Sequence, residues 1–337
     1  MLEAIDDYEH MYQVHYPGEF REPGRTQRTT PVYETLKAKG AVFGEIFGWE
    51  RAKWFDPNQE GEQYSFKRNN SFNAVAAECK AVREHAGLLD LSSFAKFDIQ
   101  GEDATSFLNR LCANRIPKKA GGISLVHLLT DLGGIECEGT VARLSKDVFY
   151  FLSAAVAEIH DEDWLDQQRL PGERVEISNV TNDYGVLVLT GPRSRDILKQ
   201  LTDADLSNEA FPWLRCQEIE VAGIPTRALR VSYVGELGWE LHHPMERMQE
   251  LYDQLHEAGT SQGLRDFGTY AVNSLRMEKA YKAWGGELTT EITPVEADLL
   301  RFVDFSKSFT GREATLARKL QSTAMQLVYL SLDSPET

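Results

Sequence analysis

One local pattern, a strand followed by a glycine and a helix, occurs twice in this chain. AKFDIQ-G-EDATSFLNRL spans residues 95–111, and GVLVLT-G-PRSRDILKQL spans residues 185–201. When Gly101 and Gly191 are aligned, apolar residues of the two helices coincide, namely Phe107 with Ile197, Leu108 with Leu198 and Leu111 with Leu201. The pattern predicts an α+β protein of two similar halves and suggests an internal duplication.

Further strands and helices are expected around these units. In residues 125–144, LVHLLT-DLGG-IECEGTVARL, the turn signal from Asp131 to Gly134 predicts a hairpin. Alternating apolar residues predict strands at 147–155 and 218–244. Helices that begin after Thr30 or end at a glycine are expected at residues 32–39, 73–87, 245–259 and 270–285, and residues 1–62 otherwise look like an irregular lead-in.

Charge and composition exclude several classes of function. The formal net charge of −16 at pH 7 repels phosphate backbones, so we expect no nucleic-acid partner. The four cysteines form no CxxC pair and the eight histidines no zinc-ligand spacing, so we expect reduced thiols and no metal. The start, MLEAIDDYEHMY, has no signal or transit character, and no apolar run reaches membrane-spanning length. We therefore expect a cytoplasmic protein without a membrane partner.

GGIECEGTV, residues 133–141, carries the first candidate site. Because side chains alternate along a strand, Glu136 and Glu138 share one face and Cys137 points to the other. The ordinary interpretation is a solvated strand face with two like charges. The functional interpretation is that one carboxylate faces a pocket and handles protons or a cationic intermediate.

VSYVGELGWEL, residues 231–241, carries the second candidate. If GELG is a four-residue hairpin loop, Tyr233 lies opposite Glu240 on one face of the hairpin. An aromatic ring beside a carboxylate suits a flat heterocycle with N–H donors. A surface pair on a hairpin is the alternative.

NSLRMEKAYKAWGGEL, residues 273–288, is the third candidate. Arg276 and Trp284, near the end of the expected helix, could line a pocket. Glu278 and Lys282 are spaced as an ordinary surface ion pair of a helix. Structure alone would account for most of this segment.

In their order, the motifs resemble one family. GLLDLSSFAKFDIQGEDATSFLNRLCAN, LLTDLGGIECEGTVARL, LTGPRSRDIL, VSYVGELGWELHHP and NSLRMEKAYKAWGGELTTEITPVEADLLRFV are similar to the folate-binding aminomethyltransferase module of the glycine cleavage T-protein. The amino-acid sequence of these motifs most resembles the C-terminal folate half of dimethylglycine and sarcosine dehydrogenases. RTTPVYETLKAKGAVFGEIFGWERAKWF resembles the segment that joins the flavin and folate halves of those enzymes.

The resemblance implies an α+β fold of two related antiparallel-sheet subdomains around a folate channel, normally closed by a C-terminal β-barrel. It implies a linker-like lead-in at residues 1–62 and a folate-binding domain at residues 63–323. The strand expected at residues 324–333, AMQLVYLSLD, would then start a truncated barrel domain at residues 324–337.

The resemblance also assigns roles to residues. The family has an essential aspartate where this chain has Glu138, which keeps the charge but moves it by about one methylene, so we expect Glu138 to be catalytic. The positions that resemble folate contacts are Thr140, Tyr233, Glu240, Arg276 and Trp284. Tetrahydrofolate is the implied cofactor, and no metal is implied.

The resemblance implies capture of an imine or formaldehyde unit from an N-methylated glycine-type amine as 5,10-methylenetetrahydrofolate. No nucleotide fingerprint is present, so FAD is not expected in this chain and a separate FAD-containing dehydrogenase is the expected partner. The alternatives are a non-catalytic folate-binding or assembly protein and a folate-dependent demethylase.

Overall fold

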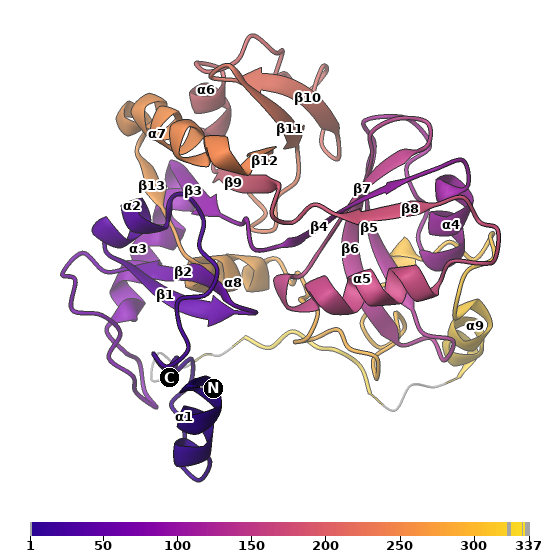
Figure 1. Cartoon of the computed structure of the whole chain (residues 1–337), viewed down its shortest axis with the longest axis horizontal. Helices are drawn as coiled ribbons and strands as arrows, with labels where there is room; N and C mark the ends of the chain where they lie inside the picture. The colour runs from indigo at the N-terminus through magenta and orange to yellow at the C-terminus, as the bar shows by residue number, and fades with distance from the viewer. Residues whose placement is uncertain (1, 322–324, 332, 334–337) are drawn as a thin grey trace.

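The computed structural model describes residues 2–321, 325–331 and 333 (Figure 1). Helices α1 to α9 span Leu2–His10, Tyr33–Ala38, Ser71–Glu84, Ala104–Leu111, Glu158–Gln167, Ser194–Leu198, Met248–Gly259, Thr269–Glu278 and Arg312–Leu320. Strands β1 to β13 span Ala41–Ile46, Trp49–Phe55, Ala86–Asp90, Ala95–Gln100, Ile123–Leu129, Ile135–Arg143, Val148–Ser153, Glu176–Asn179, Tyr184–Thr190, Cys216–Val221, Ile224–Leu229, Gly238–Pro244 and Leu264–Asp266. Short 3₁₀ turns occupy Ala155–Ala157, Met245–Arg247, Thr260–Gln262 and Leu300–Phe302.

Two sheets form the body of the molecule. The five-stranded sheet has the order β5-β6-β7-β4-β8, and all its neighbouring strands are antiparallel. The six-stranded sheet has the order β10-β11-β12-β9-β3-β13, in which only β13 runs parallel to its neighbour β3. The five-stranded sheet lies at the right of Figure 1 and the six-stranded sheet at the upper left.

The two halves repeat the same series of elements, as expected from the sequence. Each runs strand, helix, three-stranded meander, helix, strand: β4-α4-β5-β6-β7-α5-β8 and then β9-α6-β10-β11-β12-α7-β13. In each sheet the first strand of the series pairs with the last strand of the meander, β4 with β7 and β9 with β12. The prediction of an α+β fold with two related antiparallel halves is confirmed.

The glycine of each repeated unit permits a turn that no other residue fits. Gly101 and Gly191 have φ angles of +135° and +112°, which L side chains rarely adopt. A Cβ at Gly101 would lie 2.1 Å from the carbonyl oxygen of Arg174, and one at Gly191 would lie 2.6 Å from that of His85. The chain can therefore pass from strand to helix at these points only with glycine.

Helices cover both faces of the six-stranded sheet. Leu187 and Leu189 of β9 pack in one core with α6 and α7, whereas Val186 and Val188 pack on the other face with α3 and α8. This alternation is the period of two expected for a strand buried on both sides. In the five-stranded sheet, α4 and α5 contribute to the core on one face.

The lead-in contains a β-hairpin where the sequence predicted irregular structure. Strands β1 and β2 pair antiparallel around a two-residue loop, Phe47-Gly48, in which both φ angles are positive. Trp49 and Trp54 are buried, and β2 packs against α3 and α8. The aromatic residues thus attach this segment to the body, as expected, but the segment is a β-strand. The sequence did not predict the hairpin, because a loop with phenylalanine at its first position gives no ordinary turn signal.

Several expected ends of elements are wrong. Helix α3 ends at Glu84, because Gly87 pairs with Thr190 and Arg265 in the sheet instead of capping the helix. The helix expected to reach Gly285 ends at Glu278. The helix expected at 245–259 is confirmed as a 3₁₀ turn and α7.

Two further local expectations are also corrected. The Thr30 hydroxyl does not cap α2; it donates to the Asp90 carboxylate. Within the strand expected at 324–333, the described residues 325–331 and 333 form no strand, and the remaining positions lie outside the described residues. The backbone N–H of Leu327 donates instead to the carbonyl of Glu296, at 2.9 Å. The boundaries at residues 62 and 323 stay predictions.

Two general findings bear on function. In the described part of the chain, no helix is long and apolar enough to cross a membrane. Cys79, Cys112, Cys137 and Cys216 are all buried free thiols.

Glu78 of α3 joins the lead-in to α8 and gives a pH-dependent prediction. Its carboxylate accepts the backbone N–H groups of Phe55 and Gly268, at 2.7 and 2.9 Å. Burial raises its pKa from 4.5 to about 7. Between these values the folded state binds more protons than the unfolded state, so stability falls as pH rises through this window.

We expect Glu78→Gln to remove this contribution. The unfolding free energy of the wild type relative to the variant should decrease from pH 4.5 to about 7 in urea denaturation. Glu84→Gln, on the exposed side of the same helix, is the matched control and should show no such trend. If the difference in unfolding free energy between wild type and Glu78→Gln were constant across this pH range, the raised pKa of Glu78 would be contradicted.

Candidate active site between the two sheets

The β5–β6 hairpin positions Glu138. The predicted turn from Asp131 to Gly134 is confirmed, and the resulting register places His127 of β5 directly opposite Glu138 of β6. The expected alternation is also confirmed, since the Cys137 side chain enters the core beneath α4 whereas Glu136 and Glu138 share the other face. With side-chain exposures of 14% and 17%, the two carboxylates are not a freely solvated edge.

Each of the two carboxylates contacts a different histidine. Oε1 of Glu138 lies 3.3 Å from Nε2 of His127, which is fully buried. Oε1 of Glu136 lies 2.9 Å from Nε2 of the half-exposed His160, whose Nδ1 contacts Asp161 at 2.9 Å. Burial alone would lower the pKa of His160, but the hydrogen bonds and charges of Asp161 and Glu136 raise it above the ordinary value. The sequence pattern made Glu136 and Glu138 look equivalent, but each carboxylate contacts a different histidine and so has a different environment.

Glu240 of β12 has a similar environment in the other half. Its strand partners are Leu229 and Val188, and Oε2 lies 3.3 Å from Nε2 of His242. Burial lowers the pKa of His242, which favours a neutral imidazole. The other ring nitrogen of His242 lies 3.1 Å from the hydroxyl of Tyr150 on β7, which belongs to the other half.

The expected Tyr233–Glu240 hairpin pair is wrong. Residues 230–237, all described by the structure, form no strand, because β11 ends at Leu229 and that residue takes the place opposite Glu240. Tyr233 lies instead in the connecting loop, where its hydroxyl donates to the carbonyl of Lys282 at 2.8 Å. Its ring stacks on Tyr281, with ring centroids 6.2 Å apart and planes 22° apart.

Tyr233 is electrically close to Glu138 and Arg276. Burial raises the pKa of Tyr233 well above its usual value; the Arg276 guanidinium acts in the opposite direction, and the carboxylates of Glu138 and Glu287 add to the rise. Glu138 of β6 and Arg276 of α8 therefore both lie within electrostatic range of Tyr233 in the β11–β12 loop.

Arg276 and Trp284 both hold the segment after α8. The buried Arg276 donates to Asn273, to the carbonyl of Tyr281 and to Glu287. The Trp284 indole N–H donates to the carbonyl of Glu136 at 2.9 Å, which attaches this segment to β6. The expected surface pair of Glu278 with Lys282 is not formed, since Glu278 pairs with Arg83 and Lys282 lies beyond the helix end.

Glu138, Thr140 and Glu240 flank one interface between the sheets. Thr140 lies opposite Leu152, Glu240 lies opposite Leu229, and these two leucines pack in one cluster that joins the halves. Because opposed residues share a face, Thr140 and Glu240 border this cluster. Glu138 lies two residues from Thr140 and so on the same face.

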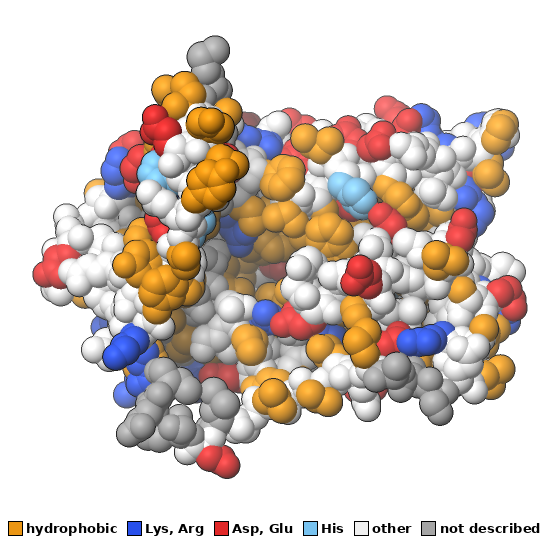
Figure 2. All heavy atoms as spheres, turned by 90° about the horizontal axis from the view of Figure 1, so that it is seen from below, with side chains coloured by type: hydrophobic (Ala, Val, Ile, Leu, Met, Phe, Trp, Pro, Cys, Tyr) orange, Lys and Arg blue, Asp and Glu red, His pale blue; other side chains and the backbone are white. Residues whose placement is uncertain are grey.

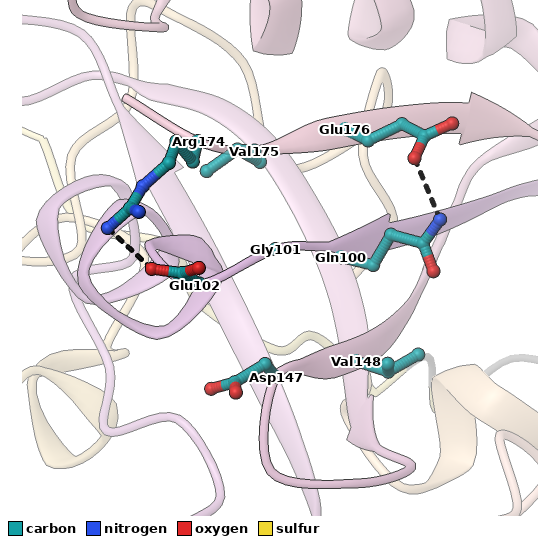
Figure 3. Close-up of a pocket in the computed structure, with 8 residues that line it drawn as sticks. All are labelled: Gln100, Gly101, Glu102, Asp147, Val148, Arg174, Val175 and Glu176. Atoms are coloured by element: carbon teal, nitrogen blue, oxygen red, sulfur yellow. Dashed lines mark hydrogen bonds and ion pairs between the residues drawn. The ribbon is translucent and has the colours of Figure 1, made fainter. Parts of the chain in front are cut away.

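The surface is hollowed near the middle of the face shown in Figure 2, where hydrophobic and charged side chains gather at the edge of the depression. A different open depression of about 610 Å³ lies at the far end of β4 and β7 (Figure 3). Its polar groups satisfy one another, Gln100 with Glu176 and Arg174 with Glu102.

Among the described residues, no group of three or more His, Cys, Asp or Glu side chains is arranged to hold a metal ion.

Comparison with known proteins identifies the family of this chain. Residues 32–307 match the family model of the GCVT N-terminal domain. The chain belongs to this family. It is 42% identical over 325 residues to dimethylglycine dehydrogenase, mitochondrial, from Mus musculus, a match that covers 95% of this chain and 37% of that protein. It is 32% identical to the pyruvate dehydrogenase phosphatase regulatory subunit, mitochondrial, also from Mus musculus, over 97% of this chain and 38% of that protein.

A solved structure shows the same fold. The crystal structure of glycine cleavage system aminomethyltransferase T from Bartonella henselae superposes with a TM-score of 0.73, covers 87% of this chain and 75% of that chain, and is 24% identical. The family model confirms the resemblance to the aminomethyltransferase family, and the solved structure confirms the fold. The chain spans less than two fifths of the length of the two curated relatives, so their activities do not transfer to it directly.

The sequence interpretation missed three contact partners of the candidate residues. His127, His242 and Tyr281 contact Glu138, Glu240 and Tyr233 respectively. A signal for His127 was available, because a turn from Asp131 to Gly134 places it opposite Glu138 by counting along both strands. No comparable signal marks Tyr281, which meets Tyr233 only through the packing of two loops.

Proposed function

We propose that this chain binds tetrahydrofolate between its two sheets and transfers a one-carbon unit to it, giving 5,10-methylenetetrahydrofolate. One observation carries the proposal most. Glu138 and Glu240, one from each half of the fold, border the same interface and each lies 3.3 Å from a buried histidine. Carboxylates held in this way beside a partly exposed pair of tyrosines suit a flat ligand with N–H donors.

The residues present fit this ligand. Glu240 would accept the N–H donors of the pterin edge, since an ionised carboxylate accepts two hydrogen bonds side by side. Tyr233 and Tyr281, each 39% exposed, offer a stacked aromatic surface. Thr140 and the segment held by Arg276 and Trp284 would complete the walls of the site.

Tetrahydrofolate supplies two nucleophilic nitrogens at which the carbon is captured. Capture from an iminium ion releases two protons, of which the departing amine takes one. Glu138 would take the other proton and would stabilise the positive charge before that transfer. Positioning of the reactants by the rest of the site would supply most of the remaining rate.

The names of the relatives support a proposal for the source of the carbon. Dimethylglycine dehydrogenase is named for oxidation of an N-methylated glycine, so we propose that an imine or formaldehyde unit from such an amine is the donor. A separate FAD-containing dehydrogenase would produce it, and we propose a cytoplasmic location for this partnership.

A second function is favoured by one relative. A regulatory subunit is 32% identical to this chain over almost its whole length, so the same fold occurs in a protein named for regulation. Binding of folate without catalysis, or a role in assembly, is therefore the competing proposal.

Titration of the chain with tetrahydrofolate, followed by addition of an N-methylglycine-oxidising flavoprotein and its substrate, separates these functions. Binding together with accelerated formation of 5,10-methylenetetrahydrofolate supports the transferase. Binding without acceleration supports the second function. Absence of binding at millimolar tetrahydrofolate would rule out both folate-dependent proposals.

Replacement of Glu240 should weaken binding. We expect Glu240→Gln to raise the Kd for tetrahydrofolate by about 10- to 100-fold, because an amide accepts fewer hydrogen bonds and carries no charge. Isothermal titration calorimetry measures the change. Glu220→Gln, an exposed carboxylate on β10 of the same sheet, is the control, and equal effects of the two variants would contradict the proposed role.

A further inference from the structure

We propose that His127 is a positioning residue for Glu138, and that Asn114 holds its imidazole in the tautomer that presents Nε2–H to the carboxylate. The inference rests on the proposed transferase function for its kinetic consequence. The arrangement of the three side chains can be tested without that function.

The orientation of the Asn114 amide is determined by the backbone. The backbone N–H of His127 donates to Oδ1 of Asn114 at 2.7 Å, so this atom must be the acceptor oxygen. The amide nitrogen Nδ2 then lies 3.3 Å from Nδ1 of the His127 ring. Both residues are buried, and water does not compete for these contacts.

The amide orientation determines the tautomer of His127. An amide NH₂ group is only a donor, so Nδ1 of the ring has to be the acceptor and cannot carry a proton. In the neutral imidazole the proton is therefore on Nε2. This is the nitrogen that lies 3.3 Å from Oε1 of Glu138.

The Nε2–H group needs the carboxylate. Among the described residues, this buried nitrogen has no hydrogen-bond partner in good alignment. A buried donor without an acceptor is unfavourable, and Glu138 offers the carboxylate oxygen at hand. A modest rotation of the Glu138 side chain would complete the hydrogen bond.

His127 acts through Glu138, because it cannot reach a ligand itself. Its side chain is fully buried, and Phe302 packs on its ring at 6.0 Å between centroids. The β5–β6 register places the two residues opposite each other, so the strands hold the imidazole in position. A donor on Oε1 would restrain the longer side chain of glutamate and would leave Oε2 as the oxygen available to a ligand.

The tautomer has a spectroscopic signature. In NMR spectra of the chain with ¹⁵N-labelled histidine, we expect the Nδ1 resonance of His127 to be that of an unprotonated nitrogen. The Nε2 resonance should be that of a protonated nitrogen. In Glu138→Gln the Nε2 proton resonance should move, because its acceptor has lost its charge. A proton on Nδ1, or a Nε2 resonance that is unchanged in Glu138→Gln, would overturn the arrangement whether or not the chain is a transferase.

The kinetic arm uses two variants of His127. We expect His127→Phe to lower kcat by about 10-fold with little change in the Kd of tetrahydrofolate. His127→Gln should recover part of this loss, since its amide nitrogen can replace Nε2 as donor. Equal losses in Phe and Gln, or a loss confined to Kd, would overturn the positioning role.

A double-mutant cycle shows whether the effect passes through Glu138. In the Glu138→Gln background, His127→Phe should reduce the residual rate by less than about twofold, because the group that it positions is gone. Additive losses would overturn the inference. If the wild type forms no 5,10-methylenetetrahydrofolate, the proposed function fails, and the resonances of His127 still decide the arrangement.

Discussion

Glu138→Gln is expected to lower the rate of 5,10-methylenetetrahydrofolate formation by about 10²- to 10⁴-fold, the range typical of a lost general base. Gln keeps the shape of the side chain but has neither the charge nor the basicity to take a proton. Folding should be little changed, because the side chain stays partly exposed on β6. The assay is production of 5,10-methylenetetrahydrofolate with a flavoprotein that supplies the imine, and the Kd of tetrahydrofolate is measured in parallel.

Glu136→Gln is the matched control for this prediction. Glu136 lies on the same strand and face, two residues away, but its carboxylate pairs with His160. Its backbone carbonyl, which accepts the Trp284 indole N–H, is kept in the variant. We expect the rate to change by less than about threefold. An unchanged rate in Glu138→Gln, or similar losses in both variants, would end the catalytic assignment of Glu138.

Gly101→Ala should be strongly destabilising. At a φ of +135° alanine is strained, and its Cβ would lie 2.1 Å from a backbone carbonyl oxygen of Arg174, so the two segments must separate. Backbone strain and overpacking each cost about 1–3 kcal/mol, which predicts a loss of about 2–6 kcal/mol in unfolding free energy. Urea denaturation measures the loss, or the variant fails to accumulate as folded protein.

Gly223→Ala provides the comparison. Gly223, in the β10–β11 turn, also has a positive φ, +72°, but nothing lies within 4 Å of a Cβ built there. Only the cost of a left-handed alanine is expected, about 1–2 kcal/mol. If the two variants were equally destabilised, the close approach of Gly101 to the Arg174 carbonyl would not be what requires glycine there.

Local signals predicted the repeated framework well. The alignment on Gly101 and Gly191 anticipated two halves with the same order of elements, and the turn at Asp131 gave the correct hairpin. These features depend on residues close together in the chain, through alternation, turn chemistry and glycine conformations. Signals of the same kind failed where pairing with a distant strand determines the structure. Gly87 was predicted to end a helix, but it pairs with Thr190 in the six-stranded sheet.

The candidate site was predicted only in part. The motifs indicated Glu138 and Glu240 as candidates, and the structure gives each a buried histidine. The pairing of Tyr233 with Glu240 was wrong, because the register of β12 is set by β9 and β11 together and not by the short GELG loop.

By itself the sequence determined that the protein is an α+β chain of two similar halves in the aminomethyltransferase family. Periodicity, glycines and ordered motifs carry that information along the chain. Only the tertiary structure decided which carboxylate has which partner. His127, Asn114 and Glu138 meet because strand pairing and a buried amide bring them together. Tyr281 meets Tyr233, and Trp284 meets the carbonyl of Glu136, through packing of segments far apart in sequence. Such contacts depend on how separate elements pack, so no local pattern encodes them.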